Sequence, residues 1–414
     1  MSKIIAMIAT LSLVHAVNAE SLGDAVQSAY SNNPQLAGAR LRQEADREYI
    51  EQARAQGRLT ANATAQGGYD RLVFGKGGTG TVSANLPIWT GGRVSSGVKV
   101  ARENVGAGAE DLRNTEAALV EQVVFAYAEV LYNLQAVEVS QLGIMRLDRQ
   151  LAEARSRYDL GQATKTDVAQ LEAQRASVEA NLEEARGVLE GVRATYAALV
   201  GHAPGNLRIP DRDLSGLPST LAEARSAALE SNPLLREQQR VTQASAARIG
   251  VERAASAPYL SLGGSYGRSG QFANTPAYRQ AREASAVVTM TVPLINGGLV
   301  GSKVRQARAN YRADIYAEDA VSLEVLRSAE TAWAAFNSAK RRSEANQSEV
   351  SAAELAARGV RTEYGLNLRT TLDILVADQA LRAAQLALAR SKSDTLIAEA
   401  ALLRASGRLD PSAF

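Results

Sequence analysis

The feature that most constrains this chain is a short stretch that occurs twice, 206 residues apart. Residues 86–93 and 292–299 share one pattern: an apolar residue, a proline, two apolar residues, a small polar residue and two glycines before a helical stretch. Proline cannot donate to a β-ladder and glycine readily adopts positive φ, so each copy predicts a strand that ends at a bend before a helix. A phosphate-binding loop is the alternative, but neither copy has the spaced third glycine or the Gly-Lys-Ser/Thr of such loops. The predicted junction residues are Pro87, Gly91, Gly92, Pro293, Gly297 and Gly298.

The repeat extends beyond these junctions and organises the whole chain. Tyr158 matches Tyr364, and Asp167 matches Asp373, with the same 206-residue offset. We therefore expect two copies of one unit, each made of helices, a β-hairpin and a long helical hairpin. The first copy covers residues 20–218, with its β-hairpin at 59–89, its helical hairpin at 94–200 and a linker at 202–218. The second covers residues 219–414, with its β-hairpin at 258–295 and its helical hairpin at 301–406.

Alternating apolar and polar residues predict the strands. Val82, Ala84, Leu86 and Ile88 fall on one face of a strand that follows a glycine-rich link at residues 75–80. The second hairpin repeats this pattern, with its last strand running to Leu294. Strands of about 10 residues are long enough to cross a bilayer at the tilt found in barrels. Two ordinary hairpins on a soluble core are the alternative, but the helices leave no other globular core for those faces to cover.

The long helices are predicted from a seven-residue repeat. No proline interrupts residues 94–158, and apolar residues recur there every seven positions, which is typical of coiled-coil packing. At about 1.5 Å per residue such a helix would be about 95 Å long, far too long for a compact domain. The alanine-rich composition, with 46% apolar but only 5% aromatic residues, also favours long packed helices. The heptad positions are Val123, Val130, Val137, Ile144, Leu151 and Tyr158.

The N-terminal residues 1–19 have the pattern of a secretory signal, so the mature chain is expected to start at Glu20. Lys3 precedes an apolar run, and small residues occupy the cleavage positions before Glu20. A short buried helix is the alternative. The chain has no cysteine, which excludes disulfides and thiolate metal sites. No later stretch offers about 18 uninterrupted apolar residues, so a membrane crossing would have to use strands.

Composition argues against catalysis and against nucleic-acid binding. The 46 basic and 44 acidic residues give a net charge of +2 without a basic cluster, so no nucleic-acid partner is expected. The two histidines, His15 and His202, lie in the signal and the linker, where they cannot build a triad or a metal cluster. We therefore expect no enzyme, no catalytic residues, no metal site and no cofactor. A periplasmic coiled-coil adaptor or scaffold without its own barrel remains the alternative function.

Four strands cannot close a barrel, and an open sheet edge in lipid would leave backbone groups without partners. Closure must therefore come from further chains. Two copies would give eight strands, whose interior side chains fill, and three would give twelve, which is enough for an open lumen. The polar strand faces fit a wet interior, so we favour three copies.

The duplicated junctions, the Tyr-x-x-Gly-x-x-x-x-Thr-Asp-Val stretch at 158–168 and its copy at 364–375 resemble the TolC family of outer-membrane efflux ducts. The resemblance covers essentially the whole mature chain. It implies an all-α coiled coil with a β-barrel segment, assembled as a homotrimer. Each protomer would supply four strands to a 12-stranded barrel in outer-membrane lipid, continued by a 12-helix periplasmic tunnel. Such ducts work with a periplasmic adaptor (membrane fusion protein) and an inner-membrane pump, an RND or ABC transporter, in efflux or type I secretion.

The resemblance also implies a gate at the periplasmic entrance. The family positions that hold the helix pairs shut correspond to Thr166, Asp167, Tyr364 and Arg369. The Tyr364 hydroxyl could donate to Asp167, and the Arg369 guanidinium could bond Thr166 or a nearby carbonyl. In the alternative reading, the aspartates at the two helix starts only favour the N-terminal dipole.

The same resemblance implies a constriction with one acidic ring. Threefold symmetry would make Asp373 a ring of three carboxylates that attracts cations. Val376 stands one turn later, where the family places a second acidic ring, so we expect a more hydrophobic constriction.

The turns of the two helical hairpins are predicted to dock the adaptor or pump. They centre on Leu160 and Gly161 in the first copy and on Gly365 and Leu366 in the second. The second turn departs from the family pattern, because Asn367 stands where glycine is usual. In the alternative interpretation, these glycines only close turns.

Overall fold

The computed structural model describes residues 19–70, 75–210, 213–271, 281–366 and 368–414. The predicted signal, apart from Ala19, and Asn367 lie outside these residues. The chain forms two compact units, which both take segments from the two sequence copies. The first unit comprises residues up to 37, 115–230 and 326–414, and the second comprises residues 38–114 and 231–325.

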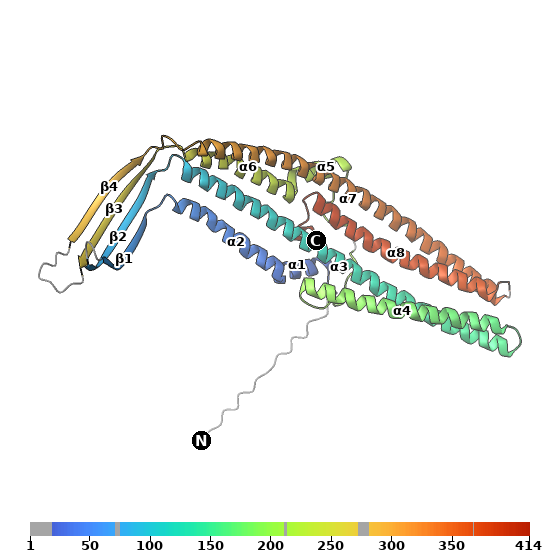
Figure 1. The fold of residues 1–414 in the computed structure, drawn as a ribbon. Helices are drawn as coiled ribbons and strands as arrows, with labels where there is room; N and C mark the ends of the chain where they lie inside the picture. Colours follow the sequence, from blue (N-terminus) through green and yellow to red (C-terminus); the bar gives the residue numbers. More distant parts are fainter. Residues whose placement is uncertain (1–18, 71–74, 211–212, 272–280, 367) are drawn as a thin grey trace, which may run out of the picture. The chain divides into compact units, whose positions relative to one another are not determined.

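Eight α-helices, four strands and a short 3-10 helix follow one another in the described residues (Figure 1). The helices before and between the hairpins are α1 (Leu22–Asn32), α2 (Pro34–Ala55), α5 (Leu221–Ser231) and α6 (Pro233–Ala254). The long ones are α3 (Arg93–Asp159), α4 (Lys165–Val200), α7 (Leu299–Gly365) and α8 (Thr371–Ala405). The strands are β1 (Thr60–Asp70), β2 (Gly75–Trp89), β3 (Tyr259–Gln271) and β4 (Ala281–Thr291), and the 3-10 helix η1 is Pro411–Ala413.

The four strands form one antiparallel sheet in the order β1-β2-β3-β4. Its register aligns the apolar residues of all four strands. Leu86 lies opposite Leu262, which in turn lies opposite Val288. On the other face, Asn62, Ser83, Ser265 and Ser285 form a polar row. The Ser265 and Ser285 hydroxyls are hydrogen-bonded at 2.8 Å. One face of the sheet is therefore apolar and the other polar, as the alternation predicts.

The predicted glycine-rich link at residues 75–80 was wrong, because these residues form the first part of β2. Gly77 pairs with Gly68 on one side and with Gln271 on the other. Glycine lacks a side chain but keeps both backbone hydrogen-bonding groups, and neighbouring strands satisfy them on both sides. Pairing with β1 and β3 thus outweighs the poor strand propensity of glycine.

The extension of the last strand to Leu294 was also wrong, since β4 ends at Thr291. Thr291 pairs with Tyr259, the first residue of β3, so the following residues have no partner strand. In the first copy, by contrast, β2 continues to Trp89 through a bulge, and Pro87 pairs with Ser261. The two copies therefore differ in how the strand reaches its bend.

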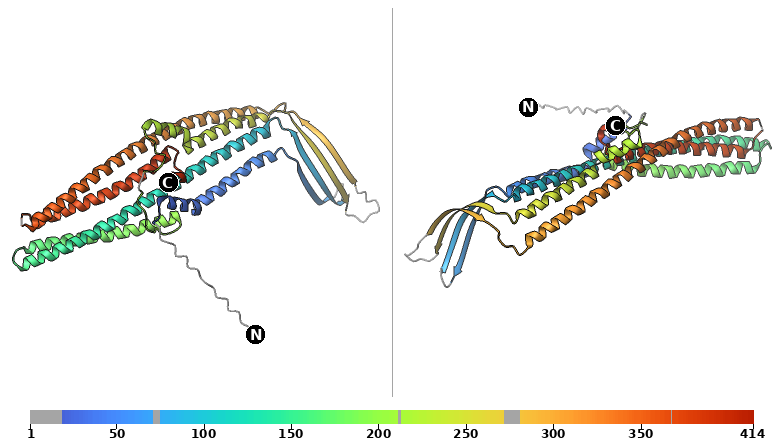
Figure 2. Two further views of the ribbon diagram at one scale, coloured as in Figure 1. Left: turned by 180° about the vertical axis from the view of Figure 1, so that it is seen from behind. Right: turned by 90° about the horizontal axis from the view of Figure 1, so that it is seen from above.

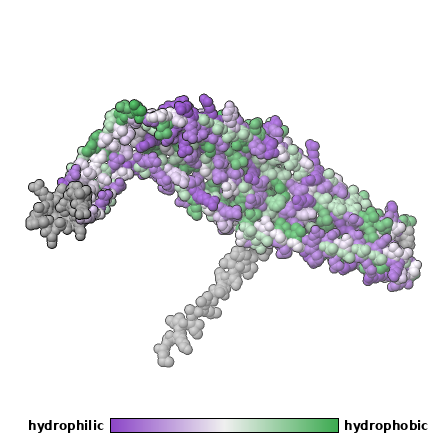
Figure 3. Space-filling model, in the orientation of Figure 1, coloured by the Kyte–Doolittle hydropathy of each residue, from purple (hydrophilic) through white to green (hydrophobic). Residues whose placement is uncertain are grey.

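Both bends use their glycine pairs in the left-handed region. Gly91 has φ 61° and Gly297 has φ 59°, and the next glycine in each copy is also at positive φ. A Cβ on Gly91 would lie 2.4 Å from the Cβ of Ala257, whereas a Cβ on Gly297 would meet nothing within 4 Å. Only the first junction is thus closed against a neighbouring segment. At the second junction the apolar side chains of Leu294 and Ile295 are exposed, and apolar residues gather there in Figure 3.

In the second unit, polar contacts tie α2 to α3, and α6 to both α3 and α7. The Gln43 amide of α2 donates to the Val105 carbonyl of α3 at 2.9 Å. Arg240 of α6 pairs with Glu103 of α3, also at 2.9 Å. On its other side α6 contacts α7, where the Ser245 hydroxyl donates to the carboxylate of Asp314.

In the first unit, α3 packs with α4, and α7 packs with α8. Of the heptad positions on α3, Val123, Val130 and Leu151 are buried. Of the described helices, α3 alone has a window apolar enough to cross a membrane by composition, and 56% of that window is buried in the protein. It is therefore a core helix. One apolar cluster joins α3, α4 and α8: Leu147, Leu151, Ala154, Leu171, Val178 and Leu375. A second joins α5, α7 and α8: Ala224, Phe336, Ala339, Ala398 and Leu402.

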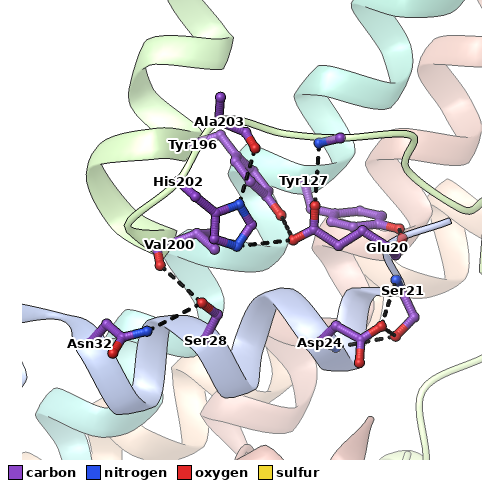
Figure 4. A network of polar contacts seen from close by, with 11 residues as sticks. Glu20, Ser21, Asp24, Ser28, Asn32, Tyr127, Tyr196, Val200, His202 and Ala203 are labelled. Atoms are coloured by element: carbon purple, nitrogen blue, oxygen red, sulfur yellow. Dashed lines mark hydrogen bonds and ion pairs between the residues drawn. The ribbon is translucent and has the colours of Figure 1, made fainter. Parts of the chain in front are cut away.

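Within the first unit, Glu20, the predicted start of the mature chain, holds the linker at 202–218 in place (Figure 4). The Glu20 backbone pairs with Asn206 and Arg208 at 2.8 and 2.9 Å. The Tyr196 hydroxyl donates to the Glu20 carboxylate at 2.6 Å, and the Tyr127 hydroxyl contacts the Glu20 carbonyl at 2.9 Å. Burial raises the pKa of both tyrosines well above the usual value, so they remain neutral donors.

Candidate functional site

The turns of the two helical hairpins lie at the same end of the first unit (Figures 1 and 2). The turn between α3 and α4 spans residues 160–164, and the turn between α7 and α8 spans residues 366–370. The residues predicted for the gate, the constriction and the docking tip all lie in or next to these turns. We call this region the turn end.

The second helix of each helical hairpin, α4 or α8, which we call the return helix, begins with the same capping box. The Asp167 carboxylate accepts hydrogen bonds from the backbone and hydroxyl of Thr164 at 2.9 and 2.7 Å, and Thr164 accepts from the Asp167 backbone at 3.1 Å. Asp373 and Thr370 repeat this arrangement at the start of α8, 206 residues later. A Thr and an Asp three residues apart satisfy the free N–H groups of the first turn. Helix capping is thus an observed role of both aspartates.

These bonds keep both carboxylates ionised. The hydroxyl and backbone bonds from Thr164 lower the pKa of Asp167, and a further side-chain bond from Thr371 of α8 acts in the same direction. For Asp373, the backbone bond from Thr370 comes first, followed by its hydroxyl bond. The turn end therefore carries two fixed negative charges, one on each hairpin.

Two of the predicted gate residues, Tyr364 and Arg369, contact neighbours that the sequence did not suggest. The Arg157 guanidinium lies 4.5 Å from the centre of the Tyr364 ring, within cation–π range. Arg369 pairs with Glu363 at 2.7 Å, and Thr166 is exposed. The described residues of the single chain do not show the predicted Tyr364–Asp167 and Arg369–Thr166 bonds. These two bonds, which we call the latch, therefore stay a prediction for the assembled channel.

The first turn closes through Gly161, which has φ 71°. Its N–H donates to the Tyr158 carbonyl at 2.8 Å, and the Gln162 N–H donates to the Arg157 carbonyl at 2.7 Å, as in a Schellman motif. The side chain of Leu160 next to it is 73% exposed. Gly161 thus has a conformational role, while Leu160 offers an apolar contact.

The second turn closes differently. Gly365 is the last residue of α7 and is not among the glycines at positive φ. The N–H groups of Leu366 and Leu368 both donate to the Glu363 carbonyl, at 3.1 and 2.9 Å. Leu366 and Leu368 are exposed. The departure from the family pattern therefore changes the backbone of the turn but keeps an apolar tip.

The predicted constriction residues lie in the first two turns of α8. Asp373 is half-buried, and Val376 is exposed. Leu372, beside them, is exposed as well. An exposed leucine and valine in this position agree with an apolar surface next to the acidic group.

A buried polar cluster one turn further along α8 was missed by the sequence interpretation. Asp378 is 2% exposed and accepts from Arg361 of α7 at 3.0 Å and from Gln150 of α3 at 2.5 Å. A buried carboxylate needs such partners, because an unpaired one is strongly disfavoured. The signal was available, since Asp378 falls between Ile374, Leu375 and Leu381 in the helical spacing of an apolar stripe.

Arg382 follows one turn later and is also buried. Burial lowers its pKa, while the nearby carboxylate of Asp378 opposes that shift. Gly143 of α3 makes room for it, because a Cβ there would lie 2.9 Å from the Arg382 Cδ. The glycine in the long helix is therefore explained by a side chain of α8.

Two further ion pairs connect the same helices. Arg390 and Arg404 of α8 pair with Glu129 and Glu121 of α3, each at 2.5 Å. Together with Gln150 and Asp378, these contacts run along the α3–α8 pair. Helix α8 is thus attached to α3 by polar contacts at three levels.

Within the described ranges, no group of three or more histidine, aspartate or glutamate residues is placed to hold a metal ion. The polar contacts of the turn end are structural links between helices.

A sheet with one apolar and one polar face is typical of the strands of a membrane channel, and this chain combines it with two long helical hairpins. The comparisons agree. The chain belongs to the outer membrane efflux protein family, whose sequence pattern matches residues 25–202 and 224–408. The predicted TolC-like fold, the outer-membrane location and the efflux-channel function are thereby confirmed. The family is one of channels rather than enzymes.

Similar proteins span nearly the whole chain. The outer membrane efflux protein BepC of Brucella suis is 30% identical over 402 residues, which cover 95% of this chain and 87% of BepC. TolC of Vibrio cholerae is 24% identical and aligns with 96% of this chain and 93% of its own length. Among solved structures, the outer membrane protein VceC of Vibrio cholerae matches with a TM-score of 0.77 at 20% identity, covering 93% of this chain and 96% of VceC.

Proposed function

We propose that three copies of this chain form a 12-stranded barrel that serves as the exit duct for an inner-membrane pump and its periplasmic adaptor. The strand pairing of the sheet supports this proposal. In the described residues β1 and β4 each pair on one side only, so both edges offer unpaired backbone groups. Those edges must be covered in lipid, and pairing β4 of one chain with β1 of the next closes the barrel.

The oligomeric state can be measured by native mass spectrometry of the detergent-solubilised mature protein. We expect a trimer, because twelve strands leave an open lumen whereas eight are filled by side chains. A dimer or a stable monomer would contradict the proposal. Val288→Arg tests the lipid-facing side: it should destabilise the assembly by about 2 to 4 kcal/mol near the midplane. Ser285→Arg, on the polar face, is the control and should cost much less.

For the gate, we propose that the α7–α8 hairpin moves away from α3 when the channel opens. The contacts that such a movement would break are those of Asp378, Arg390 and Arg404 with α3. Thr166, Asp167, Tyr364 and Arg369 would add links between neighbouring protomers, where the exposed Thr166 is free to meet a partner. Each hydrogen bond of this kind contributes about 1 to 3 kcal/mol, which is weak enough to be reversible.

Conductance in planar bilayers tests the latch. Tyr364→Phe together with Arg369→Ser should raise the single-channel conductance of the closed channel without unfolding it. The control is Arg358→Ser, since Arg358 lies on α7 and its side chain, among the described residues, forms only a long pair with Glu354 at 3.9 Å. Unchanged conductance in the double variant would exclude the latch. Asp373→Ala should reduce cation selectivity, and unchanged selectivity would exclude the proposed ring.

We further propose that the exposed leucines of the two turns dock the adaptor or pump. Leu160 and Leu366 are 73% and 66% exposed, and apolar side chains at such tips suit a partner's groove. Leu160→Asp with Leu366→Asp should abolish crosslinking to the adaptor while the trimer persists. Leu355→Asp is the control, because Leu355 is equally exposed but lies away from the turn. Equal crosslinking in both variants would argue against docking by the tips. Identifying the transporter that is purified with the crosslinked complex, RND or ABC, would give the pump class.

A further inference from the structure

Two arginines lie directly opposite each other in the sheet, on adjacent strands. Arg268 of β3 pairs in register with Arg282 of β4, and both side chains are exposed. Among the residues that the structure describes, no carboxylate forms an ion pair with either of them. Like charges directly opposite on neighbouring strands repel each other. This arrangement therefore favours the binding of an anion between them.

The arginine pair lies on the apolar face. Side chains two residues apart in a strand share a face, so Arg268 continues the row of Leu262 and Tyr266, and Arg282 continues that of Val288. The cross-strand pairs on this face, ordered from the helices toward the hairpin turn, are Leu260–Met290, Leu262–Val288, Gly264–Ala286, Tyr266–Ala284 and Arg268–Arg282. The order is apolar, then aromatic, then cationic, which is the order of groups from a bilayer core to its surface.

The position of the arginines along the strand fits the edge of the bilayer core. Arg282 lies eight residues from Met290 on β4, about 27 Å along the strand. At a barrel tilt of 35–45° this is about 20 Å along the membrane normal, near the edge of an apolar band about 25 Å tall. The helices leave the opposite end of the strands and are periplasmic in this family. The arginines therefore face the outer leaflet.

Small residues leave room beside the arginines. Gly80 of β2 lies opposite Arg268, and Ala65 of β1 lies opposite Gly80. A Cβ on Gly80 would meet nothing within 4 Å. A lipid head group can thus approach the sheet next to the guanidinium groups. Tyr266 then lies on the side of the head group that faces the bilayer core.

We propose that Arg268 and Arg282 form a binding site for the phosphate of an outer-leaflet glycolipid. A guanidinium binds phosphate through two parallel N–H···O bonds, and two of them facing one group neutralise its charge. The apolar residues below Tyr266 contact the acyl chains, which a free phosphate ion lacks. This is why the lipid, rather than inorganic phosphate, is the expected ligand.

Native mass spectrometry of the full-length mature assembly provides the test, with three probes: bisphosphorylated lipid A, the same lipid without phosphate, and inorganic phosphate. The Arg268→Gln, Arg282→Gln variant removes two charges from the sheet. Arg42→Gln with Arg47→Gln is the matched control, since it removes two charges from exposed positions on α2. Arg268→Lys with Arg282→Lys keeps the charge but loses the two-bond geometry. The same spectra report whether each variant keeps the subunit number of the wild type.

We expect the glutamine variant to bind bisphosphorylated lipid A at least about tenfold more weakly than the wild type, because each lost charge-assisted contact contributes about that factor. The lysine variant should be intermediate and the α2 control unchanged. The lipid without phosphate should bind the wild type and the glutamine variant equally. Equal binding of bisphosphorylated lipid A to the wild type and the glutamine variant would overturn the proposal. So would competition by inorganic phosphate at the same concentration, because the site would then recognise free phosphate. If the glutamine variant does not assemble, the lysine variant decides: wild-type affinity there would overturn the two-bond site. None of these readouts depends on a pump or adaptor.

Discussion

The ion pairs Arg155–Glu172 and Arg361–Asp378 occupy matching positions in the two helical hairpins, 206 residues apart. Each joins the end of a long helix to the start of its return helix, at 2.7 and 3.0 Å. Their surroundings differ. Glu172 has a side chain 49% exposed, whereas that of Asp378 is 2% exposed and also bonds Gln150 of α3. The same local pattern is a surface pair in one copy and part of a buried cluster in the other.

The difference follows from what covers each return helix. Buried residues of α4 in the first unit are all apolar or aromatic: Leu171, Val178, Leu182, Leu189, Tyr196 and Val200. Helix α8 buries charged groups as well, namely Asp378, Arg382 and Glu399. Surface pairs contribute little to stability, while a buried pair strongly destabilises the fold when one partner is removed. The second hairpin is therefore the one whose position depends on specific polar contacts.

Asp378→Ala should have the largest effect. It leaves Gln150 without its partner and Arg361 without its carboxylate, and we expect a loss of about 3 to 4 kcal/mol in unfolding free energy. Glu172→Ala, at the matching exposed pair, should cost less than about 1 kcal/mol. Urea unfolding of the detergent-solubilised protein, followed by circular dichroism, measures both. Similar losses in the two variants would show that burial does not distinguish the pairs.

Glu399 should make stability depend on pH. Burial raises its pKa to about 7, and the nearby Asp213 adds to the shift, while the Leu214 N–H bond and Lys340 oppose it. The carboxyl lines a cavity of about 310 Å³ between α3, α7, α8 and the linker. The folded state binds the proton more tightly than the unfolded state, so the stabilisation is complete below pH 4.5 and is lost as the pH rises to about 7. The change is about 3 kcal/mol.

Glu399→Gln tests this, because glutamine keeps an acceptor for the Leu214 N–H but does not titrate. The difference in unfolding free energy between variant and wild type should change by about 3 kcal/mol between pH 4.5 and 7.5, in favour of the variant at high pH. Arg193→Gln, at the matching exposed position of α4, should show no such change. If the difference in unfolding free energy between Glu399→Gln and the wild type did not change with pH, Glu399 would not be the source of the pH dependence.

The two turns should respond in opposite directions to alanine. Gly161→Ala forces a side chain into the left-handed region and should cost about 1 to 2 kcal/mol. Gly365→Ala lies in the last helical position with open space around it and should be neutral or stabilise by up to about 1 kcal/mol. Thermal unfolding of the two variants measures both changes in stability. A loss for Gly365→Ala would mean that the second turn also needs a glycine.

The capping boxes should give the smallest and most equal effects. Thr164→Ala and Thr370→Ala each remove one acceptor at a helix start and should cost about 1 kcal/mol. Because the two boxes have nearly the same geometry, the difference between the variants should be within about 0.5 kcal/mol. A larger difference in thermal unfolding would show that the contact of Asp167 with Thr371 couples the first box to α8.

The backbone plan of this protein could be predicted from the sequence. The Gly-Gly bends, the strand alternation and the helix starts at Thr164 and Thr370 depend on φ preferences and hydrogen bonds within a few residues. The duplication then extended each local inference to a second site. The main errors concerned strand ends: residues 75–80 are part of β2, and β4 ends at Thr291. Where a strand ends depends on its partner strand, which the local sequence does not show.

Only the tertiary structure decided which of two equivalent side chains is buried and which groups lie opposite each other. Asp378 and Glu172 each pair with the matching arginine of their own hairpin, but the contact of α8 with α3 buries Asp378 alone. Arg268 and Arg282 are 14 residues apart in the chain, and the register of β3 with β4 places them together. Burial and pairing depend on segments far apart in sequence, whose packing is a property of the whole fold.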